Sequence, residues 1–157
     1  MEEVRTLGSL LQEMLDLLDA GMLAVYHSDG LDYRPRFTPV VRVLGDRGPS
    51  SITTIARCAP LTHSAASQTV AQMERLGLVI VTSGSDRRQR IVSLSEKAET
   101  MLPRIREHWS ATARALADLM EETGVPLDRA LATAINALQR KGLRERIAET
   151  SRTRGAG

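Results

Sequence analysis

Apolar residues recur at helical spacing near both ends of the chain, whereas the middle mixes short helical and extended patterns. Residues 4–25 carry apolar side chains every three or four positions on two faces, which indicates one helix with two surfaces to bury. A small domain rarely covers both surfaces, so we expect a second copy of the chain to cover one of them. Residues 98–120 predict another long helix, for which Ser95 is a suitable N-cap. A final helix is expected from near Asp128 through Gly142 to Ile147.

The central segment, residues 51–94, predicts two short helices followed by two strands. Ser51 is a suitable N-cap for the first helix, and a turn through residues 58–61 leads into the second. Thr62 and Gly77 are suitable start and stop signals, so the second helix is expected over about 63–76. Apolar runs on either side of a basic loop then predict a hairpin. This order of elements is typical of a winged helix-turn-helix.

The second central helix has one apolar and one polar face. Ala66, Val70, Met73 and Leu76 recur at helical spacing and predict the inward face. The polar residues occupy the first two turns of the other face. There, a helix inserted into the DNA major groove presents its side chains to base edges and phosphates. The candidate DNA-binding residues of this helix are Thr62, His63, Ser64, Ser67 and Gln68.

The loop between the two predicted strands is rich in arginine. It contains Arg87, Arg88 and Arg90 beside a single acid, Asp86. Arginine suits phosphates and narrow minor grooves, because its planar group binds oxygen atoms bidentately and is weakly hydrated. A basic loop on its own is often only a solvated turn, but directly after a helix-turn-helix it favours contact with DNA.

Two sequence runs resemble the MarR family of bacterial transcription regulators. They are LTHSAASQTVAQMERLGLV at 61–79 and DRRQRIVSLSEKA at 86–98. The resemblance implies a homodimer that binds pseudo-palindromic operator DNA, more often as a repressor, and is often released by a small molecule. It also implies that Arg88 enters the minor groove, that Asp86 helps to fix the wing, and that the face from Thr62 to Gln68 lies in the major groove.

We therefore expect a mainly α-helical fold with a small β-wing, in which dimerisation helices flank a winged helix-turn-helix. The expected parts are an N-terminal dimerisation helix at 1–27, a DNA-binding lobe at 35–98, C-terminal dimerisation helices at 99–150 and a disordered tail at 151–157. Two recognition helices held about one DNA turn apart, ~34 Å, would read half-sites in successive major grooves.

Charge is distributed unevenly along the 157 residues, although the formal net charge is only +2. Residues 1–44 contain four arginines and seven acids, whereas residues 45–97 contain seven basic residues and four acids. The positive segment is the one that carries the pattern for DNA recognition. No apolar run approaches the roughly 20 residues that a membrane span needs, and the acidic start lacks a signal peptide. We expect a cytoplasmic protein without a membrane partner.

The sequence offers little for catalysis or metal binding. Cys58 is the only cysteine and falls in the turn before the second central helix, where we expect a small buried residue rather than a redox thiol. His27, His63 and His108 are scattered without the spacing of metal ligands, and no glycine-rich phosphate loop occurs. We therefore expect no enzyme, no cofactor and no metal.

The resemblance further implies an effector crevice between the dimer helices and the winged lobe. A small aromatic or lipophilic molecule would suit apolar walls with a few polar tips. The residues in the corresponding positions are Met22, Tyr26, Phe37, Val41, His108 and Trp109. The same residues can equally be ordinary core packing.

Two other functions stay open at this point. A dimeric winged-helix module could bind a protein partner instead of specific DNA. A ligand-binding enzyme would need turnover that survives the loss of Arg88.

Overall fold

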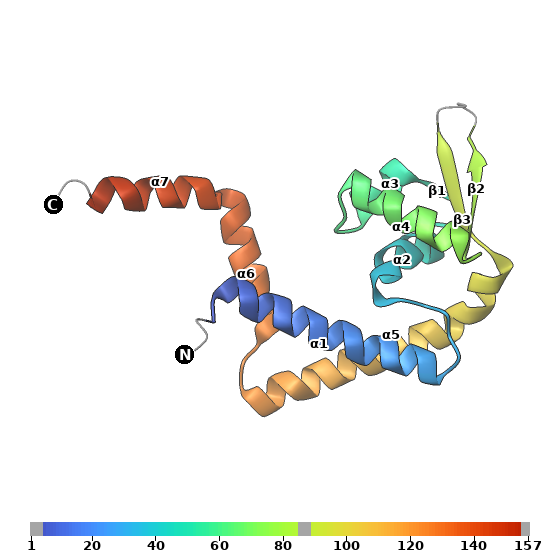
Figure 1. Cartoon of the computed structure of the whole chain (residues 1–157), viewed down its shortest axis with the longest axis horizontal. Helices are drawn as coiled ribbons and strands as arrows, with labels where there is room; N and C mark the ends of the chain where they lie inside the picture. The colour runs from blue at the N-terminus through green and yellow to red at the C-terminus, as the bar shows by residue number, and fades with distance from the viewer. Residues whose placement is uncertain (1–4, 85–88, 155–157) are drawn as a thin grey trace. The chain divides into compact units, whose positions relative to one another are not determined.

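The computed structural model describes residues 5–84 and 89–154, with side chains described as far as Ser151 (Figure 1). The chain forms two compact units that divide between Ser110 and Ala111. Within the first unit lie α1 (Leu7–Ser28), η1 (Pro35–Phe37), α2 (Thr38–Arg47), β1 (Ser50–Ser51), α3 (Ile52–Cys58), α4 (His63–Arg75), β2 (Val79–Ser83), β3 (Arg90–Leu94) and the start of α5 (Glu96–Thr123). The second unit contains the rest of α5, then α6 (Leu127–Arg140) and α7 (Leu143–Arg154).

The predicted fold class is confirmed: the chain is mainly helical, with a small antiparallel sheet. The strands lie in the order β1–β3–β2, and the hairpin is in register from Val79 opposite Leu94 to Ser83 opposite Arg90. The central strand also pairs with the short β1, where Ser50 lies opposite Val92. β1 is not predictable from the sequence, because two serines carry no alternating pattern of apolar and polar residues.

The three predicted N-caps are present in the structure. The side-chain oxygen of Thr62 accepts a hydrogen bond from the backbone N–H of Ala65 at 3.1 Å, which begins α4. In the same way Ser51 begins α3 by accepting from Thr54 at 3.1 Å. Ser95 accepts from the backbone of Ala98 at 3.2 Å at the start of α5. The predicted winged helix-turn-helix therefore has its expected local boundaries.

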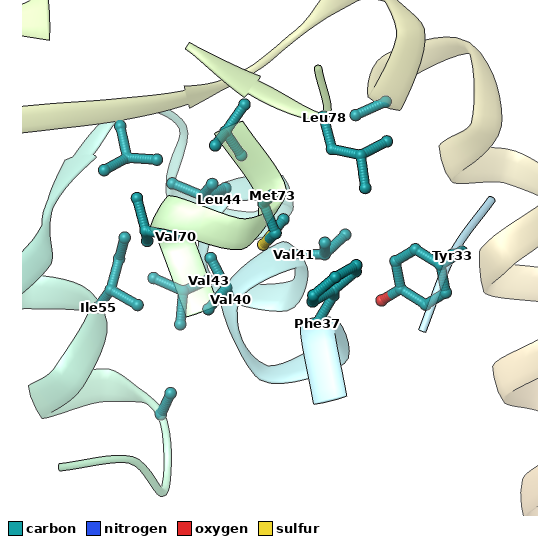
Figure 2. Packing of buried hydrophobic residues seen from close by; sticks show 14 of the residues in the cluster. Tyr33, Phe37, Val40, Val41, Val43, Leu44, Ile55, Val70, Met73 and Leu78 are labelled. Atoms are coloured by element: carbon teal, nitrogen blue, oxygen red, sulfur yellow. The ribbon is translucent and has the colours of Figure 1, made fainter. Parts of the chain in front are cut away.

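The core of the first unit lies behind α4 (Figure 2). Phe37 from η1 and Val40 and Val41 from α2 meet Val70 and Met73 from α4. Further buried core residues come from α1, the loop after it, α3, the strands and α5, and these include Tyr26, Tyr33, Ile55, Leu78, Val92 and Ile105. This packing fixes one face of α4 and leaves the opposite face available.

The structure corrects the expectation of one uninterrupted final helix. α6 ends at Arg140, because Lys141 adopts an extended backbone with φ −144° and ψ 107°. Arg146 of α7 closes the break by donating hydrogen bonds to the carbonyl oxygens of Lys141 and Ala137, at 3.0 and 2.9 Å. Two helices therefore take the place of one.

The structure also differs from the expected disordered tail at 151–157. α7 continues through Ser151 to Arg154, and the Ser151 hydroxyl donates to the carbonyl oxygen of Ile147 at 3.0 Å. Residues 155–157 lie outside the described residues.

None of the helices in the described part of the chain combines the length and the hydrophobicity that crossing a membrane requires.

Candidate DNA-binding surface

The first two turns of α4 expose a row of polar side chains. Thr62, His63, Ser64 and Gln68 are exposed and Ser67 is partly buried. On the opposite side of the same helix, Ala66, Val70 and Met73 are almost fully buried. The polar and apolar faces thus lie where the sequence predicted them, and the polar face is open to a macromolecular partner. That these five side chains contact DNA stays a prediction.

The two ends of α4 differ in how they are held. At the C-terminal end, Gly77 has a positive φ of 67°, and its carbonyl oxygen accepts from the Ser95 hydroxyl at 2.6 Å. The ammonium group of Lys97 donates to the carbonyl oxygen of Leu76 at 3.0 Å. Both contacts join this end of α4 to the start of α5. Among the described residues, α5 makes no such hydrogen bond to the N-terminal turns of α4, so α5 holds this helix only at its C-terminal end.

The N-terminus of α4 also suits an anion. A helix carries a partial positive charge at its N-terminal end, where the first N–H groups have no partner within the helix. The first turn of α4 contains no acidic residue that would neutralise this charge. A backbone phosphate could therefore approach the N–H groups that the Thr62 side chain leaves free.

The β2–β3 hairpin forms the base of the predicted wing. Beyond the last strand pair, the Gly84 N–H donates to the carbonyl oxygen of Gln89 at 2.7 Å. A Cβ atom at Gly84 would lie 3.2 Å from the Gln89 Cβ and 3.3 Å from its carbonyl oxygen, so the close approach of the two strands favours glycine. Three of the predicted wing residues, Asp86, Arg87 and Arg88, lie outside the described residues.

Arg90 is the wing arginine that the structure describes. Its guanidinium lies 3.6 Å from the Glu74 carboxylate of α4, and both side chains are about half exposed. The pair links β3 to the last turns of the recognition helix, but an exposed pair of this kind contributes only about 0–1 kcal/mol. This pairing is not predictable from the sequence pattern, because the two residues lie far apart along the chain. A DNA contact by Arg90 stays a prediction.

The structure corrects the expected burial of Cys58. It was expected to be buried in the turn, but it is the exposed last residue of α3. The buried positions of this segment are Ile52, Ile55 and Ala59, so Cys58 falls on the outward side. The neighbouring Arg57 is also exposed and adds a positive charge just before the turn into α4. Arg57 lies in the first helix of the motif, and this position could have marked it as a further basic residue near α4.

The six residues of the predicted effector crevice do come together within the first unit. Tyr26, Phe37 and Val41 belong to the buried core cluster, and Met22 and Trp109 pack against that cluster. His108 meets the Tyr26 ring edge-on at a centroid distance of 5.4 Å. This close packing agrees with the core role that the sequence left open, and the effector role stays a prediction.

A polar contact closes the edge of that cluster. His108 Nε2 lies 2.8 Å from Asp29 Oδ2, and the Arg104 guanidinium lies 3.1 Å from the same oxygen. The hydrogen bond to His108, helped by Arg104, lowers the pKa of Asp29. Burial disfavours the charged phenolate and therefore raises the pKa values of Tyr26 and Tyr33. These groups hold the end of α1 against α5.

Within residues 5–84 and 89–151, no group of three or more His, Cys, Asp or Glu side chains is placed to hold a metal ion.

Comparison with known proteins identifies the central segment. A sequence model described as the MarR family matches residues 38–89, which run from the start of α2 into the wing. No curated protein matches the chain. The matched family consists of transcription regulators rather than enzymes, in agreement with the prediction that this chain is not an enzyme.

Several solved structures share the fold. The transcriptional regulator MOSR of M. tuberculosis, solved in complex with DNA, has a TM-score of 0.68 at 18% identity, over 88% of this chain and 100% of that chain. The organohalide-sensing regulator RdhR, bound to 2,4-dichlorophenol, has a TM-score of 0.65 at 23% identity, over 86% and 83%. BpsR of Bordetella bronchiseptica has a TM-score of 0.53 at 16% identity, over 79% and 96%.

Proposed function

We propose that this chain is a regulator of the MarR family, whose sequence model matches residues 38–89, and that it represses transcription by binding a pseudo-palindromic operator as a homodimer. In this proposal the N-terminal face of α4 lies in the major groove, with Thr62, His63, Ser64, Ser67 and Gln68 toward the bases and phosphates. The wing, with Asp86, Arg87, Arg88 and Arg90, follows the adjacent minor groove.

The observation that carries the proposal is the two-sided character of α4. One face of α4 is anchored in the core, and its C-terminal end is tied to α5 through Ser95 and Lys97. The opposite face presents short polar side chains on a helix N-terminus that lacks acids. A protein-binding surface of similar size would be expected to carry aromatic and other large apolar residues, and this face carries none.

Exposed apolar residues outside the lobe support a dimer. On α1, Leu7, Leu15 and Leu17 are 74%, 56% and 69% exposed. On α6, the exposed Leu131, Ile135 and Leu138 fall on one side of the helix. A second copy of the chain could bury these residues, with 1–27 and 99–150 as the dimerisation segments and 35–98 as the DNA-binding lobe. The DNA-bound form of MOSR supports the choice of DNA as partner.

The effector proposal rests on two of the structural neighbours. RdhR was solved with 2,4-dichlorophenol, and the DNA binding of BpsR is regulated by 6-hydroxynicotinic acid. Both molecules are small and aromatic. For this chain we propose an effector of the same kind at the cluster of Met22, Tyr26, Phe37, Val41, His108 and Trp109, which binds by opening the packed side chains and then weakens DNA binding.

The test is a titration of the purified chain with fragments from its own promoter and from unrelated DNA, at several salt concentrations. We expect tight binding to one fragment, about two protein chains per site, and an affinity that falls steeply as salt rises, because phosphate contacts release counterions. The same weak affinity for all fragments would contradict an operator function. It would favour a dimeric protein-interaction module.

A further inference from the structure

A pocket between η1 and the C-terminal end of α4 has a chemistry that the proposed DNA contact does not use. Its volume is about 200 Å³, and it is lined by Arg34, Arg36, Phe37, Gln72, Arg75 and Leu76. Three of these residues carry a guanidinium group and none carries a carboxylate. The pocket belongs to the last turn of the recognition helix rather than to its first turns.

Local structure fixes the backbone beneath these arginines. Arg34 has an extended backbone with φ −125° and ψ 141°, which the following proline favours. Pro35 begins η1, and the Arg36 guanidinium lies 5.7 Å from the centre of the Phe37 ring. Arg75 lies in the last turn of α4, which packs against η1. Two guanidinium groups thus come from the η1 side and one from the recognition helix.

No carboxylate lines this pocket, although Asp19 and Asp32 line a neighbouring pocket to which Arg34 and Arg36 also belong. Like charges that share a small pocket repel one another. Two acids adjacent in sequence to this region are engaged elsewhere: Glu74 lies 3.6 Å from Arg90, and Asp32 lies 3.9 Å from Lys97. None of the three pocket arginines has an acidic partner within 4.0 Å among the described residues. A bound anion would supply the missing negative charge.

Gln72 gives the pocket a polar group that lacks a partner. Its side-chain oxygen is buried and makes no hydrogen bond with the described residues. Leaving a buried polar atom unpaired is costly, about 1–3 kcal/mol. Phe37 and Leu76 add an apolar part to the lining.

We propose that this pocket binds a small oxoanion, a carboxylate or a phosphate, through the guanidinium groups of Arg34, Arg36 and Arg75. The planar guanidinium is matched to such groups, because its N–H donors can bind two oxygen atoms at once. The bound anion links η1 to the end of α4. Except for Phe37, this site shares no residue with the effector cluster proposed above, and it does not depend on that proposal.

The test uses the purified full chain in a buffer free of phosphate and carboxylate. Sodium phosphate and sodium benzoate are titrated separately by calorimetry, and thermal unfolding is followed in each salt against sodium chloride at equal ionic strength. Phosphate tests a compact tetrahedral anion, and benzoate tests a carboxylate whose ring can rest against the apolar lining. We expect saturable binding of at least one probe, one per chain, with a higher Tm.

Variants of Arg75 locate the site. Arg75→Gln should weaken binding by at least about tenfold, because it removes charge-assisted hydrogen bonds. Arg75→Lys should lose less, because it keeps the charge without the bidentate geometry. Arg34→Gln provides a second variant from the other side of the pocket. Arg144→Gln, which removes an exposed arginine of α7 outside the lining, should bind like the original chain.

Three results would overturn the proposal. The first is that neither probe shows saturable binding above the chloride control. The second is that Arg75→Gln and Arg34→Gln both bind the probe as tightly as Arg144→Gln. In the third case, folded Arg75→Gln, checked by circular dichroism, binds operator DNA more weakly and with a smaller salt slope, which would make these arginines phosphate contacts to DNA.

Discussion

Two amphipathic helices of this chain, α4 in the winged lobe and α6 in the second unit, differ in what covers their apolar faces. Ala66, Val70 and Met73 of α4 are almost completely buried by the rest of the lobe. α6 has no buried residue, and its Ile135 is 52% exposed. The lobe therefore covers the apolar face of α4 by itself, whereas the apolar side of α6 stays open within the described residues of the second unit. We propose that the lobe reads DNA and that the open side of α6 pairs two copies of the chain.

The largest effect is expected from a truncation in the core behind α4. Met73→Ala should lower the free energy of unfolding by about 2–5 kcal/mol, because it leaves a cavity at a fully buried position. The matched control is Met120→Ala in α5, where the side chain is only partly buried and the loss should be smaller. Chemical denaturation followed by circular dichroism measures both. Equal losses would mean that the lobe and the second unit do not differ in packing.

The second prediction concerns the uncovered face of α6. Ile135→Asp should leave the unfolding of an isolated chain nearly unchanged, because the side chain is half exposed. In a dimer that buries this face, the same charge would be desolvated, and the dimer should weaken by a factor of at least ten. Analytical ultracentrifugation over a range of concentrations measures this, with Asn136→Asp as control at the adjacent exposed position. A dimer that tolerates both changes equally would place the interface elsewhere.

The wing gives a smaller effect that leaves stability untouched. Arg88→Ala should weaken binding to all operator sequences and lower the slope of log affinity against log salt by about one unit, because one phosphate contact is lost. Arg90→Ala should lower that slope less, because the Arg90 guanidinium is already beside the Glu74 carboxylate. Fluorescence anisotropy at several salt concentrations compares the two. An unchanged slope for Arg88→Ala would remove the wing from the DNA contact.

The features that the sequence predicted correctly depend on local chemistry. Thr62, Ser51 and Ser95 were identified as caps because a side-chain oxygen satisfies an N–H only three residues away. The buried stripe of α4 was also predictable, because helical periodicity is visible in the sequence alone. The polar face of α4 followed from that stripe by elimination.

The features that the sequence missed depend on partners far along the chain or on a single backbone conformation. The Arg90–Glu74 pair requires β3 to lie beside the end of α4, and the arginine pocket requires η1 to pack there as well. The break at Lys141 depends on one extended residue, which no strong signal marks beyond the neighbouring Gly142. Cys58 was misplaced because the inward side of such a short helix cannot be assigned without its neighbours.

The smallest predicted effect lies where α1 meets α5, at Asp29. The hydrogen bond from His108 lowers the pKa of Asp29 in the folded chain relative to the unfolded chain. A carboxyl group whose pKa is lowered on folding stabilises the protein above its unfolded pKa, about 3.9, and that contribution is lost as the pH falls through the lower, folded value. Asp29→Asn should therefore reduce Tm at neutral pH but not at the acidic end of the range, where the two proteins become alike. Because Asp29 is exposed, we expect only a small shift in Tm.

The control is Asp46→Asn, which changes an exposed carboxylate of α2 without an ion-pair partner among the described residues. This variant should not produce the pH-dependent difference in Tm. If Asp29→Asn lowers Tm equally at every pH, the contact acts through packing rather than charge, and α1 is held to the lobe by its apolar residues alone.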